Sequence, residues 1–463
     1  MKSDGMEVKM KVPVEKNKEY IVEIVDQGFE GEGIAKIDNF TIFIEGAIKG
    51  EKCKILIVKV TSSHAFGKVI EIFEKSKNRV ETDCGTYKRC GGCNLRHINY
   101  EETLNIKKNT VQNLVNKTLH NKIDVNMTIG MGNPYNYRNK AQYPVGLDKN
   151  NEPVMGVYAK RTHEIIPMRN CMIQNPLSEK IANFVFGFFI HNNIPVYNEK
   201  NGQGLLRHIV IKVGIRTHEI MCILVLNGKE IKKEKELVKL LIKEFPEIKT
   251  VVKNINMKNT NVILGDENEI VYGDGYIYDK LGDYTFKISP MSFYQINPVQ
   301  TEVLYNMAIE MAELSKTETL FDLYCGIGTI GIFASPYVKK VYGIEIVKQA
   351  IDDAKENANI NDIRNIEFFA GDVGKVFEEV LKKNNDEPDV IFVDPPRKGL
   401  DKHTIDNILD VKPKKIIYIS CNPASLVRDL RLLEEEYDIK EIQPVDMFPF
   451  TSHVECVAVL QLK

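Results

Sequence analysis

The sequence predicts a multidomain protein with three successive parts: a small N-terminal β-barrel, a central α+β domain and a C-terminal α/β domain. Residues 11–73 alternate apolar and polar positions in short runs separated by Gly and Asp, which is typical of a small antiparallel, OB-like barrel. Residues 76–285 mix strand-like and helical segments. Residues 286–463 alternate buried-strand runs with helical segments, and this order implies a doubly wound parallel sheet.

The barrel is predicted from four runs with Gly and Asp between them: YIVEIV, FTIFIEGA, KCKILIVKV and GKVIEI. Small barrels often present a face and loops to oligonucleotides, although a barrel that serves only for packing remains the alternative.

In the central domain, the pattern predicts a helix over residues 100–119 and a strong helix within KKEKELVKLLIKEF. The apolar stretch 181–190 is too short to cross a bilayer and is predicted to be a buried element. Strands are expected in LLRHIVIKVG, IMCILVLNG and TNVILG.

The charge pattern favours an RNA-binding surface in the middle of the chain. Overall, 62 Lys and Arg face 64 Asp and Glu, whereas residues 76–220 carry 20 basic and 11 acidic side chains. An unevenly charged soluble surface is the alternative. The polar N-terminus MKSDGMEVKM is not a signal peptide, so we expect a cytoplasmic protein with no membrane association and no obligate protein partner. Nine cysteines without an export signal point to metal binding or catalysis rather than disulfides.

A glycine-rich segment follows the first strand of the C-terminal domain, Asp322-Leu-Tyr-Cys-Gly326-Ile-Gly328-Thr-Ile-Gly331. Such glycines let the backbone turn sharply and approach a ligand closely. Glu345 ends the next strand, where it could accept both ribose hydroxyls of a nucleoside. The pattern also fits a dinucleotide, which would make the protein an iron–sulfur dinucleotide oxidoreductase, or a loop used only for packing.

Further acidic residues at strand ends distinguish these alternatives. Asp372 closes the third strand, where it can meet an adenine amino group, and Asp394-Pro-Pro-Arg397 closes the fourth. Ligands bind outside the carboxyl ends of such strands. Successive acids there suit a cationic nucleoside such as S-adenosyl-L-methionine and suit a pyrophosphate poorly, so the sequence favours a methyltransferase.

A candidate nucleophile, Cys421, follows the fifth strand and precedes a helix, whose N-terminal field is expected to favour the thiolate. Thiolate addition to carbon 6 of uracil would activate carbon 5 toward a methyl group. Glu455 is the candidate base that removes the carbon 5 proton, with a solvated surface residue as the alternative. Four other cysteines lie in apolar strand patterns and are predicted to be inert: Cys53, Cys222, Cys325 and Cys456.

The motifs Asp394-Pro-Pro-Arg, Ser420-Cys-Asn-Pro and Phe450-Thr-Ser-His-Val-Glu455 together resemble those of the RNA uracil-5-methyltransferases of the RumA/TrmA type. The resemblance runs almost end to end, and residues 11–73 look like the TRAM barrel of that family. It implies a Rossmann-like S-adenosylmethionine domain with Cys421 as nucleophile and Glu455 as base.

The resemblance also implies the ligand contacts. Asp394 is expected to hydrogen-bond the uracil edge as well as the cofactor. Thr329 departs from the Asn common in related bacterial enzymes after G-x-G, so no contact is assigned to it. The implied cofactor contacts are Gln295, Tyr324, Glu345 and Asp394.

The remaining cysteines are similar to the iron–sulfur site of this family. Cys84, Cys90 and Cys93 cluster after the barrel, and Cys171 lies far along the chain. The resemblance implies a structural [4Fe-4S] cluster on these four thiolates. A zinc site or free thiols are the alternatives.

The expected partner is RNA, with 23S rRNA as the substrate because a TRAM barrel and a cluster occur in one chain. The T-loop of tRNA is the alternative substrate. A non-catalytic RNA chaperone, which would use the barrel and the basic region alone, is the alternative outside enzymology.

Overall fold

The structure is a computed structural model that describes residues 12–384 and 386–463, so the predicted barrel start at Lys11 and the polar N-terminal segment lie outside the described residues. The chain forms two compact units. Unit 1 comprises the chain up to Asp83 with Cys93–Thr110 and Phe450–Ser452. Unit 2 comprises Cys84–Gly92, Val111–Pro449 and His453–Lys463.

Unit 1 contains the predicted barrel as a six-stranded sheet in the order β1-β5-β6-β4-β3-β2. Alternate side chains of its strands form a buried core that includes Ile42, Ile44 and Ile55. The expectation of a purely antiparallel barrel is wrong in one place, because β6 pairs with β4 in parallel. The reason is that β6 runs antiparallel to β5 and returns beside β4. The strands are β1 (Glu19–Glu23), β2 (Asp26–Gln27), β3 (Gly33–Ile37), β4 (Phe40–Glu45), β5 (Lys52–Val60) and β6 (His64–Glu74).

The helix predicted at residues 100–119 is α1 (Tyr100–Thr118). Its first half belongs to unit 1, where Ile106 packs with Ile48, Leu95 and Ile98 in a small separate core. Its second half belongs to unit 2.

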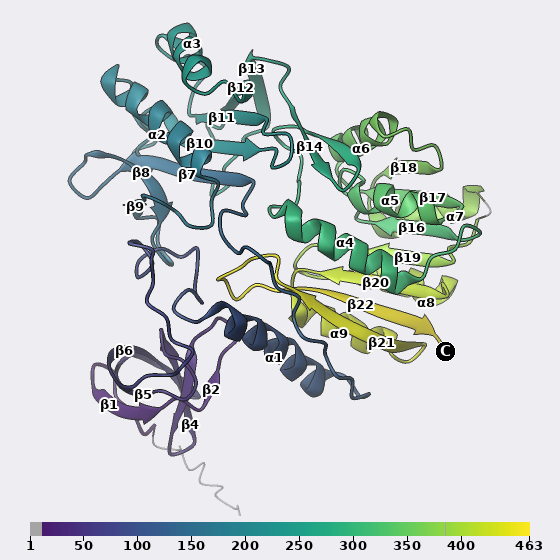
Figure 1. Cartoon of the computed structure of the whole chain (residues 1–463), viewed down its shortest axis with the longest axis horizontal. Coiled ribbons are helices and arrows are strands. Elements are labelled where there is room, and N and C mark those ends of the chain that lie inside the picture. The colour runs from purple at the N-terminus through teal and green to yellow at the C-terminus, as the bar shows by residue number, and fades with distance from the viewer. Residues whose placement is uncertain (1–11, 385) are drawn as a thin grey trace, which may run out of the picture. The chain divides into compact units, whose positions relative to one another are not determined.

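The central part of unit 2 is a seven-stranded sheet in the order β13-β12-β11-β10-β7-β8-β9 (Figure 1). Strands β10 and β11 are buried along their whole length, which explains their continuous apolar runs. One face of the sheet packs against α2 and α3. The strand expected in TNVILG is absent from the described residues, where 261–265 form a loop. The elements are β7 (Lys140–Leu147), β8 (Pro153–Tyr158), β9 (Ile165–Pro167), α2 (Pro176–His191), β10 (Leu206–Val213), β11 (Ile220–Leu226), α3 (Glu234–Glu244), β12 (Ile248–Ile255) and β13 (Glu267–Tyr272).

The C-terminal sheet of unit 2 has the order β18-β17-β16-β19-β20-β22-β21. The predicted parallel strands β16 to β20 are present, and an antiparallel pair, β22 and β21, extends one edge. The elements are β14 (Ile277–Leu281), β15 (Tyr284–Ile288), α4 (Pro298–Ala312), β16 (Thr319–Leu323), α5 (Thr329–Ala334), the 3-10 turn η1 (Ser335–Tyr337), β17 (Lys340–Glu345), α6 (Lys348–Ile360), β18 (Ile366–Ala370), α7 (Val373–Asn384), β19 (Val390–Val393), α8 (Lys402–Val411), β20 (Lys415–Ser420), α9 (Pro423–Leu433), β21 (Tyr437–Val445) and β22 (Glu455–Leu462).

Helices cover both faces of this C-terminal sheet, as a doubly wound fold requires. Because strand side chains alternate, Leu320 joins the core on the face of α4, α5 and α6, whereas Phe321 joins the core on the face of α7, α8 and α9. The first of these cores continues into β10 to β12 of the central sheet through the β14–β15 hairpin. Central and C-terminal regions therefore form one packed body.

Within residues 12–384 and 386–463, no helix combines the length and the apolar character needed to span a bilayer.

Candidate active site

The carboxyl ends of the parallel strands meet at one edge of the C-terminal sheet, and five predicted site residues lie there. Tyr324 follows β16 and Glu345 ends β17. Asp372 comes two residues after β18, while Asp394 and Cys421 directly follow β19 and β20. These residues were predicted at the ends of separate strands, and the parallel pairing brings those ends together.

The glycine segment helps to hold the Glu345 carboxylate in place. Gly326 and Gly328 have φ values of 54° and 80°, a region that side chains rarely adopt. A Cβ on Gly328 would lie 2.7 Å from the Phe368 ring. The Gly326 N–H donates to Glu345 Oε2 (3.2 Å), and the Val347 N–H donates to Oε1 (2.9 Å). Both carboxylate oxygens are thus oriented by the backbone and keep lone pairs for a ligand.

Asp372 and Tyr324 have different surroundings. Asp372 is exposed and accepts a hydrogen bond from the Lys375 N–H (3.3 Å). Tyr324 adopts a left-handed backbone conformation, and its hydroxyl donates to Asp401 (3.2 Å) and shares a hydrogen bond with Thr404 (3.2 Å). Burial raises the pKa of Tyr324, so its hydroxyl stays protonated at neutral pH.

Gln295 enters the site from the segment before α4. Its carbonyl accepts a hydrogen bond from the Asn139 side chain (2.8 Å), and its own side chain hydrogen-bonds Tyr305 on α4. The Tyr305 hydroxyl also shares a hydrogen bond with Thr329 (3.1 Å). Tyr305 thus links Gln295 to the glycine segment, a role that the apolar pattern of α4 did not reveal.

Asp322 is a buried acid that the sequence analysis did not assign to the site. Its Oδ2 accepts a hydrogen bond from the Gly331 N–H (2.9 Å), while Oδ1 has no partner among the residues that the structure describes. Burial raises the pKa of Asp322 to about 8, and the charges of Asp394 and Glu345 act in the same direction. A carboxyl group next to the glycine turn therefore holds its proton near neutral pH.

Cys421 and Glu455 lie at matching ends of neighbouring strands. The antiparallel register pairs Ser420 of β20 with Cys456 of β22, so Cys421 and Glu455 are the next residues outward on the two strands. Glu455 is 4% exposed, whereas Cys421 is only partly buried. This pairing places the predicted nucleophile, Cys421, beside the predicted base, Glu455.

The pKa of Cys421 corrects one expectation. Burial, together with the nearby carboxyl groups of Glu455 and Asp394, raises the pKa of this thiol to about 11, while Arg397 acts in the opposite direction. The helix N-terminus was expected to favour the thiolate, but burial and two acidic neighbours outweigh that field. In the ligand-free site Cys421 is a thiol.

The two acids beside Cys421 are also shifted. Burial raises the pKa of Asp394 to about 7. Burial and the charge of Asp394 raise the pKa of Glu455 to about 8, against the attraction of Arg397. Shifted pKa values gathered in one crevice are typical of catalytic sites. A cationic ligand beside these acids would favour their ionised forms.

Asn422 joins the two motif turns. It caps α9 by accepting a hydrogen bond from the Ala424 N–H (3.2 Å), and its amide donates to the Arg397 carbonyl (2.9 Å). The turn after β20 is thereby tied to the turn after β19. Both residues stand within the motifs of the sequence analysis, but their connection required the three-dimensional structure.

The four predicted cluster ligands are distributed over both units. Cys84, Cys90 and Cys171 belong to unit 2, and Cys93 belongs to unit 1. Burial raises the pKa of Cys90, and the charges of Cys171 and Cys84 act in the same direction, so these three thiols are neighbours. No group of three or more His, Cys, Asp and Glu side chains in the described part of the chain is arranged to hold a metal ion.

Comparisons with known proteins address the same regions. Residues 229–463 match the family described as tRNA (Uracil-5-)-methyltransferase, and residues 13–70 match the TRAM domain. An uncharacterized RNA methyltransferase of Oceanobacillus iheyensis is 44% identical over 98% of this chain and 99% of its own length. One of Clostridium acetobutylicum is 46% identical over 97% of this chain and 98% of its own.

One solved structure shares the fold over nearly the whole chain. It is the tRNA (uracil-54, C5)-methyltransferase of Pyrococcus abyssi in complex with S-adenosyl-L-homocysteine. The TM-score is 0.75 at 24% identity, and the likeness covers 96% of this chain and 100% of that one.

Proposed function

Because the chain belongs to the tRNA (uracil-5-)-methyltransferase family, an S-adenosylmethionine-dependent family of RNA-modifying enzymes, we propose that it methylates carbon 5 of a uridine in 23S rRNA. The observation that carries the proposal is the meeting of Cys421, Glu455 and Asp394 at the ends of three strands. The dinucleotide oxidoreductase alternative has no support in the family assignment.

Five residues are proposed to hold S-adenosylmethionine, which supplies the methyl group as a positively charged sulfonium when bound. Glu345 would accept hydrogen bonds from the ribose hydroxyls, and Asp372 would accept one from the adenine amino group. The carboxyl-rich edge of the sheet supports the binding of a cation. The proposed contacts are Gln295, Tyr324, Glu345, Asp372 and Asp394.

The proposed reaction begins with Cys421. Its thiolate adds to carbon 6 of the uracil, and the electrons of the carbon 5–carbon 6 double bond move away to form an enolate. Carbon 5 would then take the methyl group as its bond to the sulfonium sulfur breaks, and the sulfur would leave as a neutral thioether. Since a thiol near Glu455 and Asp394 resists ionisation, the step requires compensating positive charge in the loaded site.

Glu455 completes the proposed reaction. In its ionised form it removes the remaining proton from carbon 5, the double bond re-forms, and the bond between carbon 6 and the Cys421 sulfur breaks. Asp394 is proposed to hydrogen-bond the uracil edge. With a pKa of about 7, this carboxyl group can donate to a carbonyl oxygen when protonated or accept from the ring N–H when ionised.

A [4Fe-4S] cluster is proposed on Cys84, Cys90, Cys93 and Cys171, with a structural role. The donor chemistry fits, because four thiols are the usual ligands of such a cluster. The mutual influence of Cys84, Cys90 and Cys171 supports their proximity. The Gly92 N–H also donates to Cys90 Sγ (3.3 Å), a hydrogen bond of the kind that stabilises a thiolate ligand.

The test of the proposed function is transfer of labelled methyl from S-adenosylmethionine to two unmodified transcripts, 23S rRNA and tRNA. We expect 5-methyluridine in 23S rRNA. Label in tRNA alone would favour the second candidate substrate, the T-loop uridine, which the fold likeness to the P. abyssi tRNA enzyme brings into consideration. No label in either transcript would contradict the proposal and revive the RNA chaperone alternative.

A further inference from the structure

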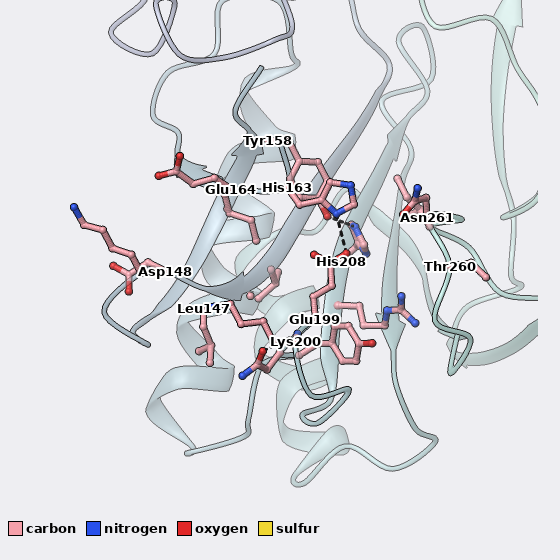
Figure 2. A pocket seen from close by; sticks show the side chains of 18 of the residues that line it. Leu147, Asp148, Tyr158, His163, Glu164, Glu199, Lys200, His208, Thr260 and Asn261 are labelled. Atoms are coloured by element: carbon pink, nitrogen blue, oxygen red, sulfur yellow. Dashed lines mark hydrogen bonds and ion pairs between the residues drawn. The ribbon is translucent and has the colours of Figure 1, made fainter. Parts of the chain in front are cut away.

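A ligand-sized cavity lies in the central sheet, apart from the strand ends that carry Cys421. It measures about 510 Å³, within the range of about 300–1,000 Å³ that is typical of small-molecule sites. Its walls come from β7, the end of β8, the start of β10 and the loops around residues 197–200 and 260–263. Figure 2 shows the rings of Tyr158, His163 and His208 gathered together, with Thr260 and Asn261 to one side.

The aromatic side of this cavity is built from contacting rings. Tyr158 and His163 lie with ring centroids 5.5 Å apart and tilted by 36°. The Tyr158 hydroxyl lies 3.4 Å from His208 Nε2, and the His163 ring pairs with Glu199 (2.8 Å). A further ring, Tyr197, is covered by the guanidinium of Arg207 at 4.5 Å. The Tyr158 ring is 37% exposed and offers a flat π surface of the kind that stacks on nucleobases.

Two of the residues that line the cavity carry buried polar atoms without partners in the described residues. They are Nδ1 of His208, which is 9% exposed, and Nε of Arg207, which is 5% exposed. Both residues line the cavity although they are adjacent on β10, because a bulge interrupts the register with β11 between Leu206 and His208. Buried hydrogen-bonding groups without partners are costly, so this wall of the cavity is polar as well as aromatic.

Arg207 also shapes the loop that was expected to be a strand. Its Nη1 donates to the carbonyls of Asn256 (2.6 Å) and Lys258 (2.8 Å). The Asn256 side chain in turn donates to the carbonyls of Val262 (2.7 Å) and Ile263 (3.0 Å). These bonds hold residues 260–263 as a wall of the cavity and fix the Arg207 guanidinium.

The cavity is joined to the candidate active site by two strands. At one end of β7, the Asn139 side chain donates a hydrogen bond to the Gln295 carbonyl. Beside it, Lys212 of β10 pairs with Lys140 of β7. The Lys212 ammonium donates to the carbonyls of Ser289 (2.8 Å) and Ser292 (3.0 Å). Four residues further along, His208 pairs with Pro144 at the edge of the cavity. At about 3.4 Å per residue, this stretch of the two strands spans about 14 Å.

We propose that this cavity binds an unpaired nucleotide of the substrate RNA, at a different position from the methylated uridine. Proteins read single-stranded RNA by stacking unstacked bases on aromatic rings and by hydrogen-bonding their edges, and the cavity offers both kinds of contact. Lys149 and Lys200 at its walls suit the accompanying phosphates. The inference rests on the proposed function, because it takes the methylated RNA as the ligand.

The test is binding of RNA to the full chain, measured by fluorescence anisotropy on the transcript fragment that the wild-type protein protects from nuclease. Tyr158→Ala should raise the Kd for this RNA about tenfold, as the loss of one stacked base does. Tyr158→Phe keeps the ring and should bind within about threefold of wild type. The matched control is Tyr272→Ala, because Tyr272 is as exposed as Tyr158 but lies on β13.

An abasic scan of the fragment separates base recognition from a general loss of affinity. One abasic position, other than the target uridine, should weaken binding to the wild-type protein and have no further effect on Tyr158→Ala. The inference is overturned if Tyr158→Ala binds like wild type, if no abasic position behaves in this way, or if the wild-type protein binds neither transcript. Binding and the abasic effect without methyl transfer would contradict the proposed function alone.

Discussion

The side-chain amide of Asn422 donates a hydrogen bond to the backbone carbonyl of Arg397 (2.9 Å), and this bond joins the turn that carries Cys421 to the turn that carries Asp394. The same side chain caps α9 through its oxygen. The Asn422 side chain therefore has two functions: it caps α9, and it fixes the position of Cys421 relative to Asp394.

Asn422→Ser should separate these functions, because serine keeps an oxygen for the cap and loses the N–H donor. We expect kcat for methyl transfer to fall roughly ten- to hundredfold, since small displacements of reacting groups are costly. Asn422→Ala should lose about 1 kcal/mol of stability in addition, because it also removes the cap. Single-turnover kinetics and thermal unfolding measure the two effects. Wild-type kcat in Asn422→Ser would show that the bond to Arg397 is dispensable.

Cys421→Ala should abolish covalent capture of RNA containing 5-fluorouridine. The fluorine cannot leave as a proton does, so the wild-type protein is expected to remain attached through its sulfur to carbon 6. Cys222→Ala is the control, because Cys222 is a fully buried thiol of β11. Denaturing electrophoresis detects the adduct. An adduct that persists in Cys421→Ala and disappears in another cysteine variant would reassign the nucleophile.

The release step should depend on the ionisation of Glu455. Burial and the charge of Asp394 raise the pKa of Glu455 to about 8, and a base must be ionised to accept a proton. The rate of adduct release should therefore increase about tenfold from pH 7 to pH 9. Glu455→Gln should trap a methylated adduct at every pH, whereas the exposed Glu387→Gln should release product normally. A pH-independent release rate in the wild-type protein would exclude Glu455 as the base.

The buried carboxyl groups should make the cofactor-free protein less stable as the pH rises. For Glu455 the unfolded chain loses its proton near pH 4.5, while the folded chain keeps it to about pH 8. Between these values the unfolded state binds fewer protons, so the free energy of unfolding decreases with pH. Asp394 and Asp322 act in the same direction.

Thermal unfolding between pH 5 and pH 8 measures this effect. Each 1 kcal/mol of lost stability should lower Tm by about 1–2 °C in a unit of this size. Glu455→Gln should show a smaller decrease across the same range, and saturating S-adenosylmethionine should also reduce it by placing a cation among the acids. A Tm that is constant, or that increases over this range, would contradict the assignment of buried protonated acids.

Strand-end positions could be predicted from the sequence because parallel strands share their direction. Glu345, Asp394 and Cys421 each end or follow a buried apolar run, and alternation with helices implies that these ends meet. The meeting of Cys421 with Glu455 could not be predicted in this way. It depends on β22 inserting between β20 and β21 in antiparallel orientation, a pairing that no local pattern specifies.

Two errors of the sequence analysis have a common cause. The thiolate of Cys421 was expected from the helix that follows it alone. Asp394 and Glu455, which raise the pKa of this thiol, come from two other strands. The strand in TNVILG was expected from the apolar alternation of that segment alone. In the fold, Asn256 binds the carbonyls of that segment, and Arg207 fixes Asn256 from β10. In both cases, charges and hydrogen bonds from distant residues determine the local outcome.

The proposed cluster on the four thiols can be tested without measuring catalysis. Protein purified anaerobically should be brown, with broad visible absorbance and about four iron and four sulfide ions per chain. Cys171→Ser should lose the colour and bound iron, because it removes the ligand that is distant in sequence. Cys53→Ser is the control, since Cys53 is buried in the barrel core and should not affect the iron content. A colourless anaerobic preparation that contains only zinc would replace the cluster with a zinc site. A preparation without any metal would leave free thiols, and then Cys171→Ser should resemble Cys53→Ser in every measurement.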